Sequence, residues 1–169
     1  MLLTTLYDIW CTTVNLITED LNRDVVEAVL LASACEEPAH IEIPLRGVNE
    51  PAVDCWLPFS RGFCMEPPPP DGSICNLILD EIPGVPNHKF AFRYTFYFFK
   101  QSTPNLPSNV CVGSFSRSRN APSVHGDIVV IKHDLEDKVV NIQPREIDFI
   151  ATIAALAANQ RMFRLHSGE

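Results

Sequence analysis

A strict alternation of side chains between His88 and Lys100 constrains the fold more than any other feature of the sequence. The residues of one parity are all aromatic, and most of those of the other parity are polar. The aromatic set is Phe90, Phe92, Tyr94, Phe96 and Phe98. Because side chains alternate between the two faces of a strand, this pattern predicts a strand over 88–100 with its rings on one side.

Three further strands and a helix are predicted downstream of this segment. Short β-branched runs indicate strands at 109–115, 126–133 and 138–142, and the acidic turn between the last two predicts a β-hairpin. The strand at 126–133 carries apolar residues on both parities, so we expect it to be internal in the sheet. Pro144, followed by acidic residues and an alanine-rich apolar run, predicts a helix over 144–160. We expect this helix to pack on the ring face and to bury it.

The first part of the chain shows a different pattern. Apolar residues recur at spacings of three and four over 3–34, which predicts N-terminal helices, the second over about 22–34 with Asn22 as its N-cap. The β-branched residues of 12–18 leave a strand open as the alternative there. The high proline content of 38–73 predicts irregular structure, with any strand confined to short pieces such as 39–43. The expected fold class is therefore one α+β domain over 1–169: an antiparallel sheet of about four strands packed against N-terminal helices and a C-terminal helix.

Composition narrows the class of protein. With 46% hydrophobic and 20% charged residues in 169, the chain suits one folded domain and not a disordered segment. No apolar run reaches the length of a membrane span, and no basic residue precedes Arg23, so neither a membrane anchor nor a secretory signal is expected. We therefore expect a cytoplasmic or nuclear protein without membrane partners.

The six cysteines contain no C-x-x-C pair, and in an intracellular protein they are expected to be reduced and structural. Cys55, Cys64 and Cys75 could join a histidine to bind zinc, although structural zinc sites usually have ligands two to four residues apart. No metal ligand set is assigned on this basis, and whether these three cysteines share a site is left open.

Catalytic signatures are sparse. No P-loop or dinucleotide fingerprint occurs, so no cofactor is expected. His125 and His133, with Asp127 or Asp134 to orient either ring, are the only parts of a possible Cys- or His-dependent hydrolase, and no motif marks a nucleophile. His133, beside an acidic turn, is interpreted as a solvated hairpin residue. The adjacent carboxylates Glu36-Glu37 and Asp80-Glu81 are interpreted as solvated surface.

A nucleic-acid interface is the first alternative function. The net charge of −8 is uneven, because residues 82–126 contain five basic residues and no acidic one. Lys89-Phe90-Ala91-Phe92 resembles the strand of RNA-recognition motifs on which bases stack, although the glycine after the lysine is missing and Arg93 follows. Under this alternative the aromatic face is a stacking platform, and otherwise it is core. The candidate nucleic-acid-binding residues are Lys89, Phe90, Phe92, Arg93, Arg117 and Arg119.

The proline run is the candidate protein-binding segment. Residues 67–70 should adopt polyproline II, which either serves as a stiff connector or binds a groove of the SH3 or WW type. The leading hypothesis is an intracellular protein-interaction module without catalytic activity, whose partner is a protein. An RNA- or single-stranded nucleic-acid-binding domain comes second, and a small hydrolase third. The candidate partner-binding residues are Pro67, Pro68, Pro69 and Pro70.

Overall fold

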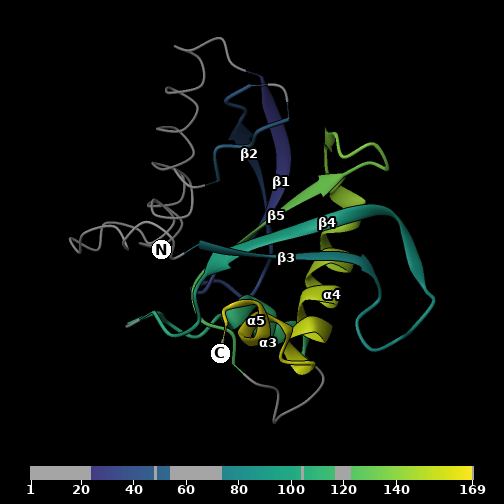
Figure 1. The fold of residues 1–169 in the computed structure, drawn as a ribbon. Helices are drawn as coiled ribbons and strands as arrows, with labels where there is room; N and C mark the ends of the chain where they lie inside the picture. Colours follow the sequence, from purple (N-terminus) through teal and green to yellow (C-terminus); the bar gives the residue numbers. More distant parts are fainter. Residues whose placement is uncertain (1–23, 48, 54–73, 104, 117–122, 169) are drawn as a thin grey trace.

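An antiparallel sheet dominates the computed structural model, which describes residues 24–47, 49–53, 74–103, 105–116 and 123–168 (Figure 1). Five strands follow the spatial order β2-β1-β5-β4-β3, and β6 pairs with β5. The strands are β1 (Val25–Leu31), β2 (Ala39–Pro44), β3 (Ile74–Glu81), β4 (Lys89–Phe99), β5 (Ile128–His133) and β6 (Val139–Val140). The helices of the described residues are α3 (Val110–Phe115), α4 (Ile147–Asn159) and α5 (Met162–His166), with a 3-10 turn at Pro144–Glu146 before α4.

The helix predicted over 22–34 is wrong, because residues 25–31 form strand β1. The last four residues of β1 are all buried, so both of its faces carry apolar side chains. A run that is apolar on both faces contains the spacings of three and four that also indicate a helix. Residues 25–31 form a strand and not a helix because they pair with β2 and with β5, where Leu30 lies opposite Val129. The rest of the predicted helical segment, residues 3–23, lies outside the described residues.

The sheet also has more strands than the four expected. β2 lies at the short stretch 39–43, which was named as a possible strand within the Pro-rich segment. β3 was not predicted, although it alternates: Leu77 and Leu79 are buried, whereas Asn76, Ile78 and Asp80 are exposed. Residues 54–73 of the Pro-rich segment lie outside the described residues.

The strand predicted at 109–115 is wrong as well, because this segment is helix α3. Asn109, only 5% exposed, begins the helix by accepting a hydrogen bond from the Val112 N–H at 2.8 Å. Its side-chain amide donates to the carbonyls of Leu31 and Gly126, both at 2.8 Å. One polar side chain thus joins the start of α3 to the end of β1 and to the segment before β5, and these distant partners override the β-propensity of Val110 and Val112.

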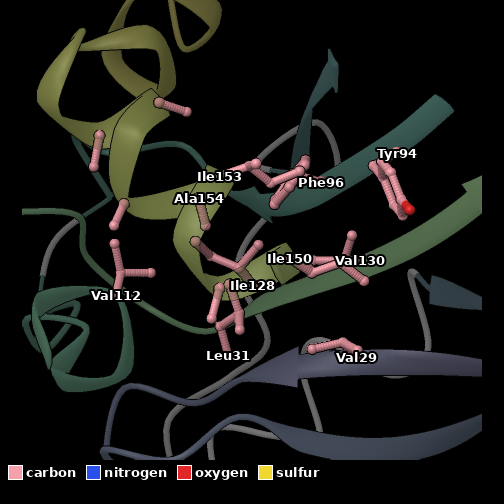
Figure 2. Close-up of a cluster of buried hydrophobic side chains, with 14 of the residues drawn as sticks. Val29, Leu31, Tyr94, Phe96, Val112, Ile128, Val130, Ile150, Ile153 and Ala154 are labelled. Carbon is pink, nitrogen blue, oxygen red and sulfur yellow. The ribbon is translucent and has the colours of Figure 1, made fainter. Parts of the chain in front are cut away.

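The predicted aromatic strand, hairpin and C-terminal helix are confirmed as β4, β5–β6 and α4, with β6 shorter than expected. Tyr94, Phe96 and Phe98 are buried, and Phe90 and Phe92 pack partly buried against the same cluster. Figure 2 shows Phe96 facing Ile153 of α4, with Val130 of β5 beside Ile150. The rings of Phe98 and of Phe163 in α5 make an edge-to-face contact, with their centres 5.0 Å apart.

The two faces of the sheet belong to two separate apolar clusters. The residues of one parity pack with α3, α4 and α5. Those of the other parity form a second cluster that includes Leu30, Ile43, Val129 and Ile131. β5 contributes to both clusters and lies between β1 and β4, which confirms that it is an internal strand buried on both faces.

Candidate functional site

The outer edge of β3 is the first feature of interest. β3 ends the strand order, and among the described residues no strand other than β4 pairs with it. No backbone hydrogen bond within the described part of the chain joins residues 74–81 to a loop or helix. In an antiparallel pair, alternate residues direct their N–H and C=O groups away from the partner strand. The outer edge of β3 therefore presents backbone donors and acceptors to whatever lies beside it.

A pocket of about 400 Å³ lies along this edge. Residues 78–81 of β3 line it on one side, and Gln160 and Met162, at the junction of α4 and α5, line it on the other. Gly84, in the turn after β3, has a positive φ of 80°, and a Cβ there would lie 3.0 Å from the Gln160 Nε2 atom. The positive φ favours glycine in this turn, and a Cβ here would require the end of the Gln160 side chain, which lines the pocket, to shift.

The pocket combines an apolar side chain with two carboxylates. Ile78 is 54% exposed, and Asp80 and Glu81 are exposed, with no hydrogen bond or ion pair from either carboxylate to a described residue. Lys89 lies opposite Glu81 in the strand register, and the register shifts between Leu79 and Glu81, as at a β-bulge. Asp80 and Glu81 are exposed, as the sequence interpretation expected, and they also line the pocket, so their carboxylates are available to a charged ligand.

A buried polar cluster lies at the other end of α4. Lys132 of β5 donates to both carboxylate oxygens of Glu146, at 2.8 and 2.9 Å, and its ammonium lies 3.8 Å from the centre of the Phe92 ring. The Tyr94 hydroxyl donates to Glu146 Oε1 at 3.1 Å, and the Gln143 N–H donates to Oε2 at 2.8 Å. These bonds join the sheet to the start of α4.

The cluster also shifts the acid–base behaviour of its members. Burial acts to raise the pKa of Glu146, but the hydrogen bonds and charge of Lys132 outweigh it and lower the pKa. Burial raises the pKa of Tyr94, and the Glu146 carboxylate raises it further. Lys132 is only 5% exposed. Every charged group already has its partner, so the cluster positions α4 and offers no unengaged acid, base or nucleophile.

The candidate nucleic-acid-binding residues are divided between the two faces of β4. Phe90 makes edge-to-face contacts with Tyr94 and with Phe149 of α4, at ring distances of 5.8 and 5.4 Å, and Phe92 lies beneath Lys132. Lys89 is exposed, whereas Arg93 forms an ion pair with Asp137 in the hairpin turn. A base could stack on these rings only by displacing helix α4 or Lys132. Arg117 and Arg119 lie outside the described residues.

The candidate hydrolase parts are not assembled within the described residues. Asp127 accepts a hydrogen bond from the Ser33 N–H at 2.6 Å, and Asp134 accepts from two N–H groups of its own turn. Ser123 Oγ lies 3.4 Å from His125 Nε2, but no described carboxylate bonds to that ring. His133 is only half-buried, and its Nε2 atom is enclosed without a hydrogen-bond partner in the described structure, so the interpretation as a solvated residue was incomplete.

The remaining sequence candidates are described only in part. Cys75 is half-buried in β3, whereas Cys55, Cys64 and the prolines 67–70 lie outside the described residues. Among the residues that are described, no three histidine, cysteine or acidic side chains come together as a metal site. The edge strand β3 was not predicted from the sequence. The alternation of Leu77 and Leu79 with Asn76 and Ile78 was the signal that could have revealed the strand, but not its place at an edge.

Comparison with known proteins found no family model, no curated protein and no solved structure that matches this chain. None of the helices in the described segments has both the length and the apolar character needed to cross a bilayer.

Proposed function

We propose that this protein is a protein-interaction module that binds an extended segment of a partner as an additional strand on β3. The observation that supports this most directly is the outer edge of β3, unpaired among the described residues, with a pocket beside it. Strand addition is a common mode of peptide recognition, in which backbone hydrogen bonds supply affinity and a neighbouring pocket supplies specificity. The role is one of binding, without a catalytic step.

The outer edge of β3 and the pocket beside it, together called the groove below, suit an extended peptide. A strand added to β3 would pass the pocket that residues 78–81 form with the α4–α5 junction, and every second side chain would point toward one face. Ile78 offers an exposed apolar contact at the pocket, and Met162 offers a flexible one from the opposite wall. A volume of about 400 Å³ lies within the range of small-ligand pockets, so it can hold one large side chain.

The charges of the groove favour a basic partner segment over a second copy of this chain. Asp80 and Glu81 supply two carboxylates, offset in part by Lys89 across the strand pair. The whole chain carries a net charge of −8, which opposes association between copies at low ionic strength. Charged residues and a bulge at an edge strand also protect it from pairing with another identical edge. The occupant is therefore an extended segment of a different protein with a lysine or arginine near the pocket.

We propose the cytoplasm or nucleus as the place where this interaction occurs. Cys35, Cys75 and Cys111 carry free thiols in the structure, and thiols persist in reducing compartments.

A peptide-display selection tests the proposal. Random peptides are selected on the full chain, and amide hydrogen exchange then maps the binding site of the enriched peptides. The expected result is enrichment of peptides with one basic residue at a fixed position, together with slower exchange along Ile74–Glu81. The doubly substituted variant Asp80→Lys, Glu81→Lys should lose most of this binding. Enriched peptides that leave the exchange of β3 unchanged would refute the proposal.

The matched control carries the same change of charge on another part of the surface. Glu36 and Glu37 are adjacent, exposed and remote in sequence from β3, and the variant Glu36→Lys, Glu37→Lys should bind the selected peptides as the wild type does. An equal loss in both variants would show that only net charge matters. Binding of single-stranded RNA that weakens steeply with salt, with no peptide enriched, would instead favour the nucleic-acid alternative.

A further inference from the structure

Helix α3 lies alongside the turn that follows β1. The Asn109 side chain donates to the Leu31 carbonyl at 2.8 Å, the Val110 N–H donates to the Ser33 carbonyl at 3.2 Å, and the Ser114 hydroxyl donates to the Glu36 carbonyl at 2.9 Å. Residues 31–36 and 109–114 therefore run side by side in the same direction. Cys35 belongs to the first segment and Cys111 to the second, so these bonds bring the two cysteines into one neighbourhood.

The two thiols differ in their surroundings. Cys35 is exposed, whereas Cys111 is fully buried, with 0% of its surface accessible. Burial raises the pKa of the Cys111 thiol to about 12, and the neighbouring Cys35 contributes to this rise, which places the two sulfur atoms within electrostatic range of one another. An oxidant would therefore meet Cys35 first, because the reactive form of a cysteine is an accessible thiolate.

We propose that Cys35 and Cys111 form an oxidation site, at which a peroxide converts the two thiols into a reversible disulfide. This inference does not depend on the groove at β3. The product would join the turn after β1 to the second residue of α3. These two segments are already held in register by the three hydrogen bonds described above, so the crosslink would need only a local adjustment of α3.

The chemistry balances with hydrogen peroxide as the only added reagent. The Cys35 thiolate attacks one peroxide oxygen, an S–O bond forms as the O–O bond breaks, and water leaves after protonation. The Cys111 sulfur then attacks the sulfur of the Cys35 sulfenic acid, the S–S bond forms as the S–O bond breaks, and the departing hydroxide takes the Cys111 proton as a second water. Two thiols are oxidised to one disulfide, and the peroxide is reduced to two waters.

The burial of Cys111 determines the order and the speed of these steps. With its high pKa, Cys111 stays protonated at neutral pH and acts only as the second thiol. Its attack requires a brief local adjustment of α3 that exposes the Cys111 sulfur, so the disulfide should form more slowly than the sulfenic acid on Cys35. In a reducing compartment, a disulfide that forms and breaks in this way is transient and not a permanent structural bond.

Peptide mapping tests the site directly. Trypsin releases Cys35 in residues 24–46 and Cys111 in residues 101–117, and neither peptide contains another cysteine. After the full chain is treated with limiting hydrogen peroxide and remaining thiols are blocked, we expect these two peptides to be linked, with the mass of two hydrogen atoms lost. Dithiothreitol should release them. Amide exchange across Val110–Phe115 should be slower in the oxidised protein than in the reduced one.

Two single variants serve as a test and as its control. Cys35→Ser should abolish the linked peptides without affecting folding, because Cys35 is exposed. Cys75→Ser, in the half-buried strand β3, should leave them unchanged. The proposal is overturned if Cys35 becomes sulfinic acid while Cys111 stays a free thiol, if Cys35 links to a different cysteine, or if neither thiol reacts.

Discussion

Strands β5 and β3 belong to the same sheet but have opposite surroundings. β5 lies between β1 and β4, and five of its six residues are buried, including a lysine. β3 pairs only with β4 among the described residues, and its side chains alternate between the core and the surface. A substitution in β5 therefore meets packed atoms on both faces, whereas a substitution on the exposed face of β3 meets solvent. Both strands contribute to the core, but the exposed face of β3 can change with little effect on the fold, as the proposed binding role requires.

The two strands also differ in the surroundings of their charged residues. Lys132 in β5 is enclosed and has a complete set of partners in Glu146 and the Phe92 ring. Asp80 and Glu81 in β3 are exposed and have none among the described residues. A buried charge must be paired, because desolvation costs several kcal/mol, whereas an exposed carboxylate is stable in water and is available to a ligand.

The largest effect is expected from Val130→Lys at the centre of β5. Val130 is 0% exposed and faces α4, so the new ammonium would be buried without a partner. We expect the variant not to fold, and far-UV circular dichroism together with the elution volume in size exclusion would show it. A variant that folds with a cooperative transition would mean that the centre of the sheet is more open than described.

The next effect is expected from Phe96→Ala, which removes a fully buried ring from the face of β4 that packs on α4 and α5. Phe96 contacts Phe163 at a ring distance of 6.2 Å. The loss of packing and the cavity should lower the free energy of unfolding by about 3–5 kcal/mol. Urea denaturation measures it. An unchanged midpoint would indicate that the aromatic face is not part of the core and would revive the stacking-platform hypothesis.

A smaller, pH-dependent effect is expected from Glu146→Gln. The amide keeps the shape but leaves Lys132 with a neutral partner, which should cost about 1–3 kcal/mol at pH 7. In the wild type, the pKa of Glu146 is lower in the folded state than its ordinary value of 4.5. Its stabilising contribution is therefore fully present above that value and is lost as the pH falls through the folded-state pKa.

The stability difference between wild type and Glu146→Gln should shrink as the pH falls below about 4.5, and parallel urea titrations across that range measure it. A difference that stays constant down to strongly acidic pH would show that the carboxylate does not owe its contribution to its charge.

The smallest effect on stability is expected at β3. Ile78→Asp changes a side chain that is 54% exposed, so the free energy of unfolding should change by no more than about 0.5 kcal/mol, while binding of selected peptides should fall at least tenfold. Leu135→Asp, at a residue 81% exposed in the hairpin turn, is the matched control and should leave both unchanged. Thermal unfolding and peptide titration separate the two readouts. A large loss of stability in Ile78→Asp would show that Ile78 itself is packed and is not available to a ligand.

The local pattern of residues was sufficient to predict β4, the β5–β6 hairpin and α4. The alternation over Lys89–Phe99 has a period of two, which a helix cannot satisfy. The acidic turn marks the end of β5, and Pro144, whose ring fixes φ, marks the start of the 3-10 turn before α4. These segments carry their information in neighbouring residues, so the sequence by itself determined their structure and the burial of the ring face.

Only the tertiary structure decided β1, α3 and the two sites. Val25–Leu31 has a spacing compatible with helix or strand, and the Asn109 side chain both caps α3 and donates to the carbonyls of Leu31 and Gly126, which are distant in sequence. The groove at β3 requires Gln160 and Met162, the ion pair joins Lys132 to Glu146, and Cys35 adjoins Cys111 only through the docking of α3. Each of these features depends on contacts between residues far apart in the chain. The free energy of forming such a contact depends on both partners, so it cannot be read from a short stretch of sequence.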